Sequence, residues 1–277
     1  MPRHSRFSKS HKYWLTLFLC FTPKAIATSV AVIVFANFIV IAVDSKRVEF
    51  RNGKRIVTTD CKLHHVSDTY FVVSGKTELM GQYDAVTVAR KAVKAAGDPK
   101  VAATDFAERM RPKMLWVVQQ MNNWPDAPDT KVFAQSPTML GAVFIRFKNG
   151  IPFINIRRFE WQRTQKHTFA LGKTVVYDCV GVCNSSLANV YRMGMFVDSP
   201  DIKQTIRDRN TAASGAVALI RADIPKYGEY VGEPISEVTL DIMGAYWLND
   251  EACKAESAPK TKRQAQKSNN ATLHKNQ

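Results

Sequence analysis

The sequence predicts an α+β fold, a four-layer αββα sandwich in which two antiparallel sheets pack on each other and helices flank them. Two observations lead to this prediction. Strand patterns over residues 28–74 and 138–182 are separated by two helical patterns over 83–121, and a further helical pattern over 201–224 precedes a last strand. Each sheet buries one face on the other, which leaves its second face for helices. The 277 residues, of which 45% are hydrophobic, therefore suffice for one domain with a buried core.

The first predicted strands form a hairpin over residues 28–43. This segment holds eight Val or Ile residues, whose branched side chains favour strands over helices. A break near Ala36-Asn37 divides it into two short strands. Asn52-Gly53 marks the next hairpin turn, and Lys62–Ser74 forms a further strand pair that turns at Ser67-Asp68. The first part of the chain is therefore expected to be an antiparallel sheet.

Two helices are predicted next. Apolar residues at helical spacing follow Tyr83, and Gly97-Asp98-Pro99 supplies the stop signal of this helix. A second helix covers about residues 101–121, where Pro112 is expected to kink it or to mark a join. Both helices carry an apolar face, so we expect them to lie on a sheet.

Strands resume after the helices. The strongest hairpin signal in the chain is Asn149-Gly150, between the alternating apolar runs Thr138–Phe147 and Ile151–Trp161. The remaining predicted elements are a strand over Thr174–Val182, a helix over Asp201–Ile224 and a last strand over Ile235–Asp241, after which Gly244–Trp247 closes the fold. The globular domain is therefore expected to span residues 28–253.

The formal charge of +15 is concentrated at the two ends of the chain. Residues 1–27 carry five basic and no acidic side chains, and residues 254–277 carry six basic and one acidic, which leaves +5 over the middle 226 residues. No arginine–aromatic stripe or zinc-finger spacing accompanies the charge, so specific binding of nucleic acid is not expected. Residues 254–277 have almost no apolar side chains and are expected to form a disordered basic tail.

The first 27 residues have the three parts of a secretory signal peptide. A basic, polar stretch over Met1–Tyr13 precedes the eight-residue apolar run Trp14–Phe21, and Ala25-Ile26-Ala27 has the small-x-small pattern of a cleavage site. Removal of residues 1–27 implies an exported protein, periplasmic or secreted, without a stable membrane anchor. The alternative is an uncleaved anchor that continues into Thr28–Val43, but that run has 16 residues where a span needs about 20.

Four cysteines remain after removal of this leader: Cys61, Cys179, Cys183 and Cys253. In an exported chain an even set permits disulfides, and three pairings are open. We expect a disulfide that involves Cys179, Cys183 or Cys253, and a long-range pairing with Cys253 stabilises more than the short Cys179–Cys183 loop. Neither the cysteines nor His64-His65 have the pattern of a metal site, so no metal and no cofactor is expected.

Cleavage after Ala27 makes Thr28 the first residue of the mature chain. Its hydroxyl and a free α-amine then stand on one residue, and an ordinary α-amine, with a pKa of about 7.7–8.0, can accept the hydroxyl proton near neutral pH. Asp44 follows sixteen residues later, at the end of the second strand of the hairpin, so folding of the hairpin brings it back beside Thr28. Lys62 opens the next strand, and a nearby ammonium favours an alkoxide.

At these residues the chain resembles the proteasome β-subunit branch of the N-terminal nucleophile (Ntn) hydrolases. The resemblance is carried by Thr28-Ser29, by Ile39–Arg47 with Asp44 inside it, by Cys61-Lys62-Leu63, and by Ser74-Gly75. It implies an Ntn-hydrolase-like fold and a threonine-type peptidase or amidohydrolase. In that resemblance Thr28 is the nucleophile and its own base, Asp44 and Lys62 are its electrostatic partners, and the backbone amide of Gly75 is the oxyanion donor.

The chain departs from the pattern of this family at positions that would support the nucleophile. Gly228 and Val231 stand where the family carries an aspartate and a serine before its last strand. For the other supporting serine, the candidates are Ser185 and Ser186.

The sequence leaves three functions open. The first is an exported hydrolase that cleaves peptide or small amide substrates through an acyl-enzyme on Thr28. The second is a catalytically inactive scaffold or interaction protein of the same fold. The third is a membrane-anchored protein that keeps residues 1–27. The substrate and the oligomeric state, including a homo-oligomer, also stay open.

Overall fold

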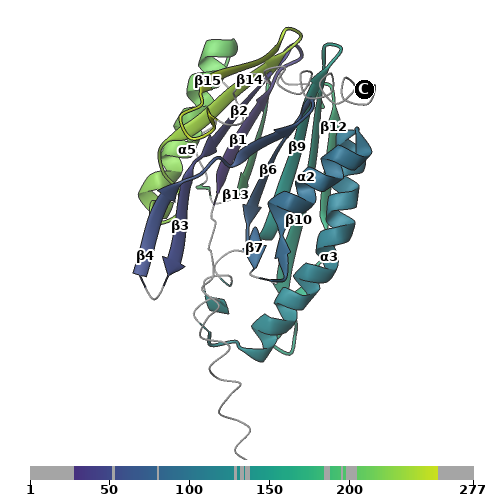
Figure 1. Cartoon of the computed structure of the whole chain (residues 1–277), viewed down its shortest axis with the longest axis vertical. Helices are drawn as coiled ribbons and strands as arrows, with labels where there is room; N and C mark the ends of the chain where they lie inside the picture. The colour runs from purple at the N-terminus through teal and green to yellow at the C-terminus, as the bar shows by residue number, and fades with distance from the viewer. Residues whose placement is uncertain are drawn as a thin grey trace, which may run out of the picture.

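A computed structural model describes residues 28–254 apart from residues 52–53, 80, 128–129, 132–133, 135–137, 184–187, 195 and 198–204. The predicted leader over residues 1–27 lies outside this part of the chain, as does the predicted tail after residue 254. In the described part, two antiparallel sheets lie face to face, with two helices on one sheet and a single helix over only part of the other (Figure 1).

The first sheet carries the predicted N-terminal hairpin at its centre. Its five strands, in spatial order, are β13 (Asn189–Gly194), β1 (Ser29–Val34), β2 (Phe38–Asp44), β14 (Ile235–Asp241) and β15 (Gly244–Asn249). The hairpin of β1 and β2 turns at Ala36-Asn37 as predicted, and Val30 pairs with Val43. Both strands are buried along their whole length. This burial explains why the sequence shows a continuous Val and Ile run instead of alternation.

The second sheet contains six strands. In spatial order they are β11 (Phe169–Leu171), β10 (Ile151–Arg163), β9 (Thr138–Lys148), β6 (Thr69–Gly75) and β5 (Leu63–Val66), and β12 (Val175–Val180) also pairs with β10. The predicted turns at Ser67 and at Asn149-Gly150 are confirmed, since these residues have positive φ angles between paired strands. Two small ribbons lie outside both sheets: β3 (Lys46–Arg51) with β4 (Lys54–Thr59), and β7 (Glu78–Leu79) with β8 (Tyr83–Asp84).

Each of the three helices in the described part begins at an acidic cap. They are α2 (Ala85–Ala96), α3 (Pro99–Asn123) and α5 (Arg209–Tyr227). The carboxylates of Asp84, Asp98 and Asp208 accept backbone N–H groups of the first turn of their helices. Pro112 lies inside α3 without ending it. The helix predicted over Asp201–Ile224 is thus found as α5, with a later start and a slightly later end.

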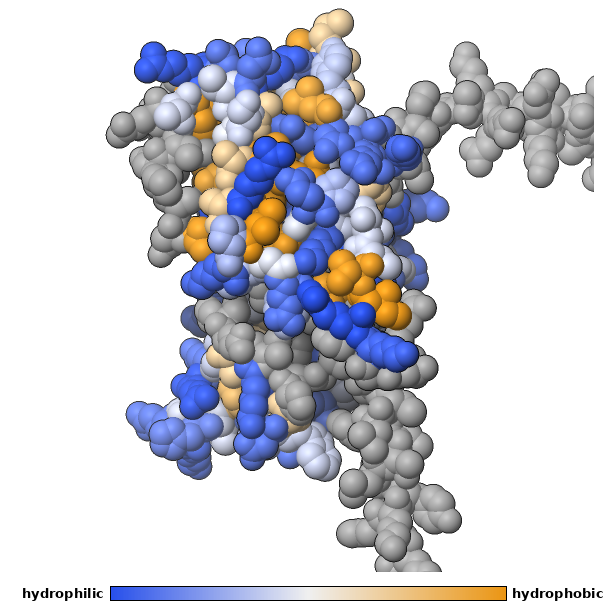
Figure 2. Space-filling model, turned by 90° about the vertical axis from the view of Figure 1, so that its left-hand side faces the viewer, coloured by the Kyte–Doolittle hydropathy of each residue, from blue (hydrophilic) through white to orange (hydrophobic). Residues whose placement is uncertain are grey.

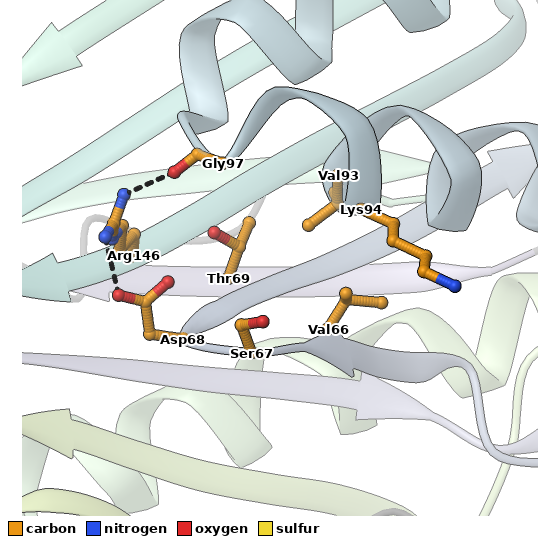
Figure 3. Close-up of a pocket in the computed structure, with 8 residues that line it drawn as sticks. All are labelled: Val66, Ser67, Asp68, Thr69, Val93, Lys94, Gly97 and Arg146. Atoms are coloured by element: carbon orange, nitrogen blue, oxygen red, sulfur yellow. Dashed lines mark hydrogen bonds and ion pairs between the residues drawn. The ribbon is translucent and has the colours of Figure 1, made fainter.

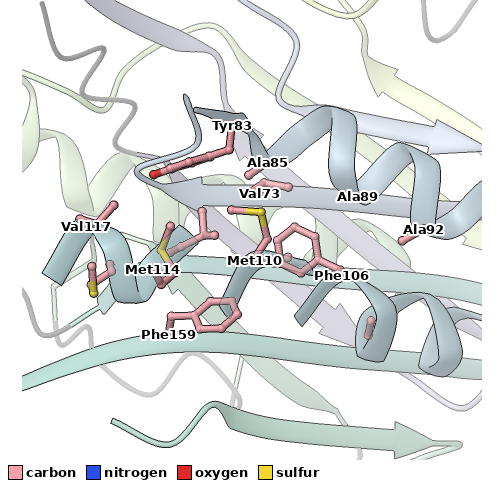
Figure 4. Packing of buried hydrophobic residues seen from close by; sticks show 14 of the residues in the cluster. Val73, Tyr83, Ala85, Ala89, Ala92, Phe106, Met110, Met114, Val117 and Phe159 are labelled. Atoms are coloured by element: carbon pink, nitrogen blue, oxygen red, sulfur yellow. The ribbon is translucent and has the colours of Figure 1, made fainter. Parts of the chain in front are cut away.

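Hydrophobic side chains are buried in three zones between these elements. Val32 and Val143 belong to the zone between the two sheets. Phe106 of α3 and Phe159 of β10 belong to the zone beneath α2 and α3, where alanines of α2 let the helix approach the sheet closely (Figure 4). Ile220 of α5 belongs to the third zone, on the outer face of β1 and β2.

The predicted four-layer αββα sandwich is wrong as a description of this fold. Strands make up 44% and helices 29% of the structure, so it is a sheet-rich fold of mostly antiparallel sheets rather than a helix-flanked four-layer sandwich. The reason lies on the first sheet, where α5 is the one described helix and packs mainly on β1 and β2. One helix cannot cover five strands, and the hairpin of β14 and β15 keeps four large apolar side chains exposed, Ile242, Met243, Tyr246 and Leu248.

One side of the molecule has a surface that is partly hydrophobic and partly hydrophilic (Figure 2). Figure 2 shows the side that carries β3, β4, α5 and β15 in Figure 1, and hydrophobic residues occur there in separate patches between hydrophilic ones. Val57 of β4 and Leu248 of β15 are among the exposed apolar side chains. Hydrophilic residues therefore divide the apolar surface on this side (Figure 2).

Candidate active site

A buried ion pair joins the two sheets at one end of the molecule. Lys62 Nζ lies 2.8 Å from Asp44 Oδ2, and the two side chains are 5% and 0% exposed. Asp44 is the last residue of β2 in the first sheet, and Lys62 directly precedes β5 in the second. The structure therefore brings together two of the residues that the sequence analysis singled out.

Burial dominates the electrostatics of this pair. It raises the pKa of Asp44 and lowers the pKa of Lys62, because each charge loses hydration. The attraction between the two groups and the hydrogen bond that joins them oppose both shifts. The two charges are therefore most stable in close contact, since each compensates the other in a poorly solvated site.

Ser29 connects Thr28 to two buried carboxylates. Its backbone N–H donates to Asp44 Oδ1 over 2.7 Å, and its hydroxyl donates to Asp223 Oδ2 on α5. Asp223 is fully buried, pairs with Arg192 of β13 and accepts the N–H of Val197. The residue next to Thr28 is therefore held, directly or through Asp223, by contacts from β2, α5 and β13.

Asp223 and Arg192 were not predicted as site residues. A signal for Asp223 was present, because it follows Leu219 by four residues and Ala216 by seven, and these are buried positions of α5. This spacing places all three on one helix face. A carboxylate on a buried face needs a partner of opposite charge, although the sequence does not say which.

Thr28 directly precedes β1, and the alternation of side chains along this strand predicts that its side chain is on the face that points to the second sheet. It shares this face with Val30 and Val32, which belong to the zone between the sheets, because side chains alternate along a strand. Thr28 is fully buried, and its Oγ1 has no hydrogen-bond partner among the residues that the structure describes. Gly194 of β13 approaches so closely that a Cβ there would lie 1.6 Å from the carbonyl oxygen of Thr28. Only glycine fits beside this backbone.

Gly75 ends β6 at the same end of the second sheet as Lys62. Leu63 pairs with Val72 in antiparallel strands, so the residues just before Leu63 lie at the same end of the sheet as Gly75, which still pairs with Leu140 of β9. Gly75 has a φ of +92°, and a Cβ there would lie 2.4 Å from the carbonyl oxygen of Met139. Conformation and space both require glycine at this position. The role of its amide as an oxyanion donor stays a prediction.

The positions that depart from the family pattern hold no carboxylate or hydroxyl side chain. The carbonyl of Gly228 accepts a hydrogen bond from Lys46 Nζ, and Val231 is buried in the zone beneath α5. Glu229, between them, uses its backbone carbonyl to accept a hydrogen bond from Arg55. Ser185 and Ser186 lie outside the described residues.

Two disulfides lie among the residues that the structure describes. Cys61–Cys253 joins residues 192 positions apart, with Cα atoms separated by 4.8 Å, and Cys179–Cys183 closes a short loop at the end of β12. The prediction of a disulfide that involves Cys179, Cys183 or Cys253 is confirmed. Cys61 directly precedes Lys62, so the long-range disulfide lies next to the ion pair.

A pocket of about 550 Å³ lies at the other end of the second sheet. The turn between β5 and β6, the last turn of α2 and Arg146 of β9 surround it (Figure 3). Arg146 pairs with Asp68 at 2.6 Å and donates to the carbonyl of Gly97 over 2.9 Å. The guanidinium therefore serves to join the turn, the helix end and β9, and we assign no ligand to this pocket.

The membrane-anchored alternative depends on residues 1–27, which the structure does not describe. None of the helices in the described part has the length and the apolar composition to cross a membrane.

Comparison with known proteins gives structural similarity but no family. No protein-family model matches the sequence, and no curated protein matches it. Among solved structures, the chain is similar to Anbu (ancestral beta-subunit) from Yersinia bercovieri, with a TM-score of 0.45 and 12% identity over 88% of this chain and 95% of that chain. It is also similar to an Anbu (Gly-1) mutant from Hyphomicrobium sp. strain MC1, with a TM-score of 0.44 and 13% identity over 89% of this chain and 97% of that chain.

These findings correct the predicted family. The resemblance in sequence indicated the proteasome β-subunit branch of the Ntn hydrolases, whereas the similar structures are Anbu proteins, a proteasome-like family. Short motifs such as Ile39–Arg47 are a weak basis for a family, because polar residues commonly end a buried strand. Similarity at this level places the chain in neither family and carries no statement about its reaction.

Proposed function

We propose that this protein is an exported N-terminal-threonine hydrolase that cleaves peptide or amide bonds through an acyl-enzyme on Thr28. The observation that carries the proposal is the buried Asp44–Lys62 ion pair, which is hydrogen-bonded through Asp44 to the residue after Thr28. A buried ion pair is a poor source of stability, because the desolvation of both charges offsets their attraction. An ammonium held beside a hydroxyl nucleophile has a chemical use, since it lowers the cost of forming the alkoxide.

The proposed reaction starts from a chain that has been cleaved after Ala27. The α-amine of Thr28 accepts the proton of the Thr28 hydroxyl, and Oγ1 attacks the carbonyl carbon of the substrate. The N–H of Gly75 donates to the oxyanion of the tetrahedral intermediate, and Lys62, held by Asp44, stabilises the negative charge on Oγ1. The C–N bond then breaks, the proton passes from the α-amine to the leaving amine, and an ester remains on Thr28. A water molecule then gives a proton to the α-amine while its oxygen attacks the ester carbon. The C–Oγ1 bond breaks, Oγ1 takes the proton back from the α-amine, and the acyl group leaves as a carboxylic acid.

Export belongs to the same proposal. The three-part leader over residues 1–27 would be removed on export, which creates the mature N-terminus. Two disulfides support an oxidising compartment such as the periplasm or the extracellular space, because thiols stay reduced in the cytosol of most organisms. A peptide or a small amide is the proposed substrate.

The experiment treats the mature protein with an electrophile directed at hydroxyl nucleophiles and maps the modified peptide. We expect sequencing of the mature chain to begin at Thr28, modification at Thr28, and turnover of a peptide-amide substrate. Thr28→Ala is expected to abolish modification and turnover while the far-UV spectrum stays unchanged, because it removes the nucleophile and few packing atoms. A mature chain with another first residue, or turnover by Thr28→Ala at the wild-type rate, excludes the proposal.

A second candidate is a catalytically inactive scaffold or interaction protein. Gly228 and Val231 favour it, because they lack the carboxylate and the hydroxyl that would support a nucleophile. In that case the mature chain still begins at Thr28, but neither modification by the electrophile nor turnover is observed.

A further inference from the structure

We propose that the Cys61–Cys253 disulfide is a redox-sensitive clamp that holds Lys62 against Asp44, and that its reduction lowers the activity of the site. The inference rests on the proposed function, because it assigns a means of regulation to the same site.

The disulfide and the ion pair are neighbouring links between the same two sheets. Cys61 leads into β5 of the second sheet, and Cys253 follows β15 of the first. Lys62, the neighbour of Cys61, reaches from the second sheet to Asp44 of the first. The position of Cys61 therefore sets the point from which the Lys62 side chain extends.

Both cysteines stand beside edge strands. β5 has four residues, lies at one edge of the second sheet, and pairs with β6 alone among the described strands. β15 lies at an edge of the first sheet and pairs in the same way with β14. An edge strand has a hydrogen-bond ladder on one side, so its ends open at a lower free energy than those of a central strand. The Cys61–Cys253 disulfide therefore restrains both edge strands, each of which lacks hydrogen bonds to a described strand on its second side.

Contacts around Cys253 lead back to Asp44. Cys253 Sγ lies 3.3 Å from Ser236 Oγ, which lies 2.9 Å from Ser45 Oγ. Ser45 directly follows Asp44, and its carbonyl accepts the N–H of Asp60, which directly precedes Cys61. Release of Cys253 therefore loosens the surroundings of both members of the ion pair.

The two cysteine residues differ in exposure, which sets the expected order of the reduction. Cys253 is 1% exposed, whereas Cys61 is partly exposed. The thiolate of a dithiol attacks Cys61 Sγ, the S–S bond breaks, and Cys253 leaves as a thiolate that takes up a proton. The second sulfur of the dithiol then attacks the mixed disulfide and releases Cys61 as a thiol. In total, two electrons and two protons pass from the dithiol to the protein, and the dithiol becomes a disulfide.

Loss of the clamp changes the environment of Lys62. Its ammonium is stable in the buried site because Asp44 lies at hydrogen-bond distance. Once the edge strands separate slightly, water competes with Asp44 for the ammonium, since a charge gains hydration by leaving a poorly solvated site. The site then lacks the positive charge that stabilises the Thr28 alkoxide.

The experiment measures the access of reagent to Lys62, together with turnover, in the full mature chain before and after treatment with dithiothreitol. Lysines are acetylated with an amine-reactive ester, and each site is quantified by mass spectrometry. We expect reduction to raise the labelling rate of Lys62 about tenfold, which corresponds to about 1.4 kcal/mol of easier local opening, and to lower turnover of a peptide amide by a similar factor. Cys253→Ser is expected to show the high labelling rate with and without dithiothreitol.

Two controls separate local release from general unfolding. Cys183→Ser removes the other disulfide, at the end of β12, and its Lys62 labelling is expected to follow the wild type. Lys76, which is 7% exposed, is expected to stay protected after reduction. Unchanged Lys62 labelling after reduction of Cys61–Cys253, or an equal rise at Lys62 and Lys76, overturns the clamp. Absence of turnover in the oxidised wild type overturns the proposed function instead, and Lys62 labelling still decides whether the clamp exists.

Discussion

At the scale of single residues, buried charge is the main feature of the candidate site. Asp44, Lys62, Asp223 and Arg192 form two ion pairs in which each carboxylate is fully buried and each cation is at most 10% exposed. Ser29 joins the two pairs, because its N–H donates to Asp44 and its hydroxyl donates to Asp223. A change at Asp223 is therefore expected to reach Thr28 through its neighbour in the chain.

Asp223→Asn tests this connection. The variant keeps the size of the side chain but removes the charge that pairs with Arg192, so we expect the free energy of unfolding to fall by about 3–5 kcal/mol. We also expect a lower kcat with little change in KM, because Ser29 loses a charged acceptor and Thr28 is held less firmly. Urea denaturation and steady-state kinetics measure the two effects.

Asp241→Asn is the matched control. Asp241 also pairs with an arginine, Arg209 of α5, whose side chain is 44% exposed and stays hydrated after the change, whereas the Asp241 side chain is 7% exposed. The expected loss is therefore smaller than for Asp223→Asn, about 1–2 kcal/mol, with unchanged kcat. Equal losses of stability in the two variants, or an unchanged kcat in Asp223→Asn, would contradict the role given to Asp223.

At the scale of elements, the pairing of β13 with β1 depends on one glycine. Gly194 has a φ of +94° and leaves no space for a Cβ beside the carbonyl of Thr28, whereas Gly181 has a similar φ of +76° with no atom within 4 Å of a Cβ. Gly181→Ala is therefore expected to lower the free energy of unfolding by about 1 kcal/mol, because alanine disfavours the positive φ but meets no neighbouring atom. Gly194→Ala has the same unfavourable backbone conformation and must also displace β1. We therefore expect its free energy of unfolding to fall by at least about 3 kcal/mol and its turnover to be lost.

Urea denaturation of the two glycine variants measures this difference. A Gly194→Ala variant as stable and as active as Gly181→Ala would show that β13 does not constrain the backbone of Thr28.

A second element, β14, carries a buried carboxyl whose protonation affects stability. Glu237 is 7% exposed, and its Oε1 has no hydrogen-bond partner among the described residues. Burial raises the pKa of Glu237 from 4.5 to about 7. Between these values the folded chain keeps a proton that the unfolded chain has released, so the free energy of unfolding falls as the pH rises. The stabilisation that comes from this retained proton is fully present below about pH 4.5 and is lost as the pH rises through about 7. The free energy of unfolding falls by about 3 kcal/mol in total over this range.

Glu237→Gln is expected to remove this part of the pH dependence, because the amide does not titrate. Urea denaturation between pH 4.5 and pH 8 gives the slopes for the wild type and the variant. Glu229→Gln, a change at an exposed position, is expected to keep the wild-type slope. A Glu237→Gln variant whose stability falls with pH as steeply as the wild type would disprove the assignment.

At the scale of the whole molecule, the Cys61–Cys253 disulfide links the two sheets, whereas Cys179–Cys183 stays at the end of β12. The Cys61–Cys253 disulfide closes a loop of 192 residues, and Cys179–Cys183 closes one of four. A longer closed loop restricts the unfolded chain more, so Cys253→Ser is expected to cost about 5 kcal/mol of unfolding free energy and Cys183→Ser about 2 kcal/mol. Denaturant midpoints of the oxidised proteins measure both values, and equal losses would contradict the loop-length argument.

The sequence by itself determined features that depend on near neighbours. The Val and Ile run over residues 28–43 predicted the central hairpin, and Asn149-Gly150 predicted the turn between β9 and β10. Gly97 was recognised as the stop of α2 because a glycine adopts the left-handed conformation there without strain. The return of Asp44 to the start of β1 was also predicted, because it is a short-range consequence of one turn. The catalytic roles of Asp44 and Lys62 stay predictions.

Only the tertiary structure decided which distant segments meet. Asp223 reaches Ser29 across 194 positions of sequence. The four cysteines could pair in three ways, and the pairing of Cys61 with Cys253 was decided only when the fold brought the edges of the two sheets together. The extent of α5 on the first sheet was also undetermined, since periodicity shows that a helix has an apolar face but not how many strands that face covers. Turns and caps are encoded by interactions within a few residues, whereas contacts between sheets depend on the packing of the complete chain, so they became visible only in the folded molecule.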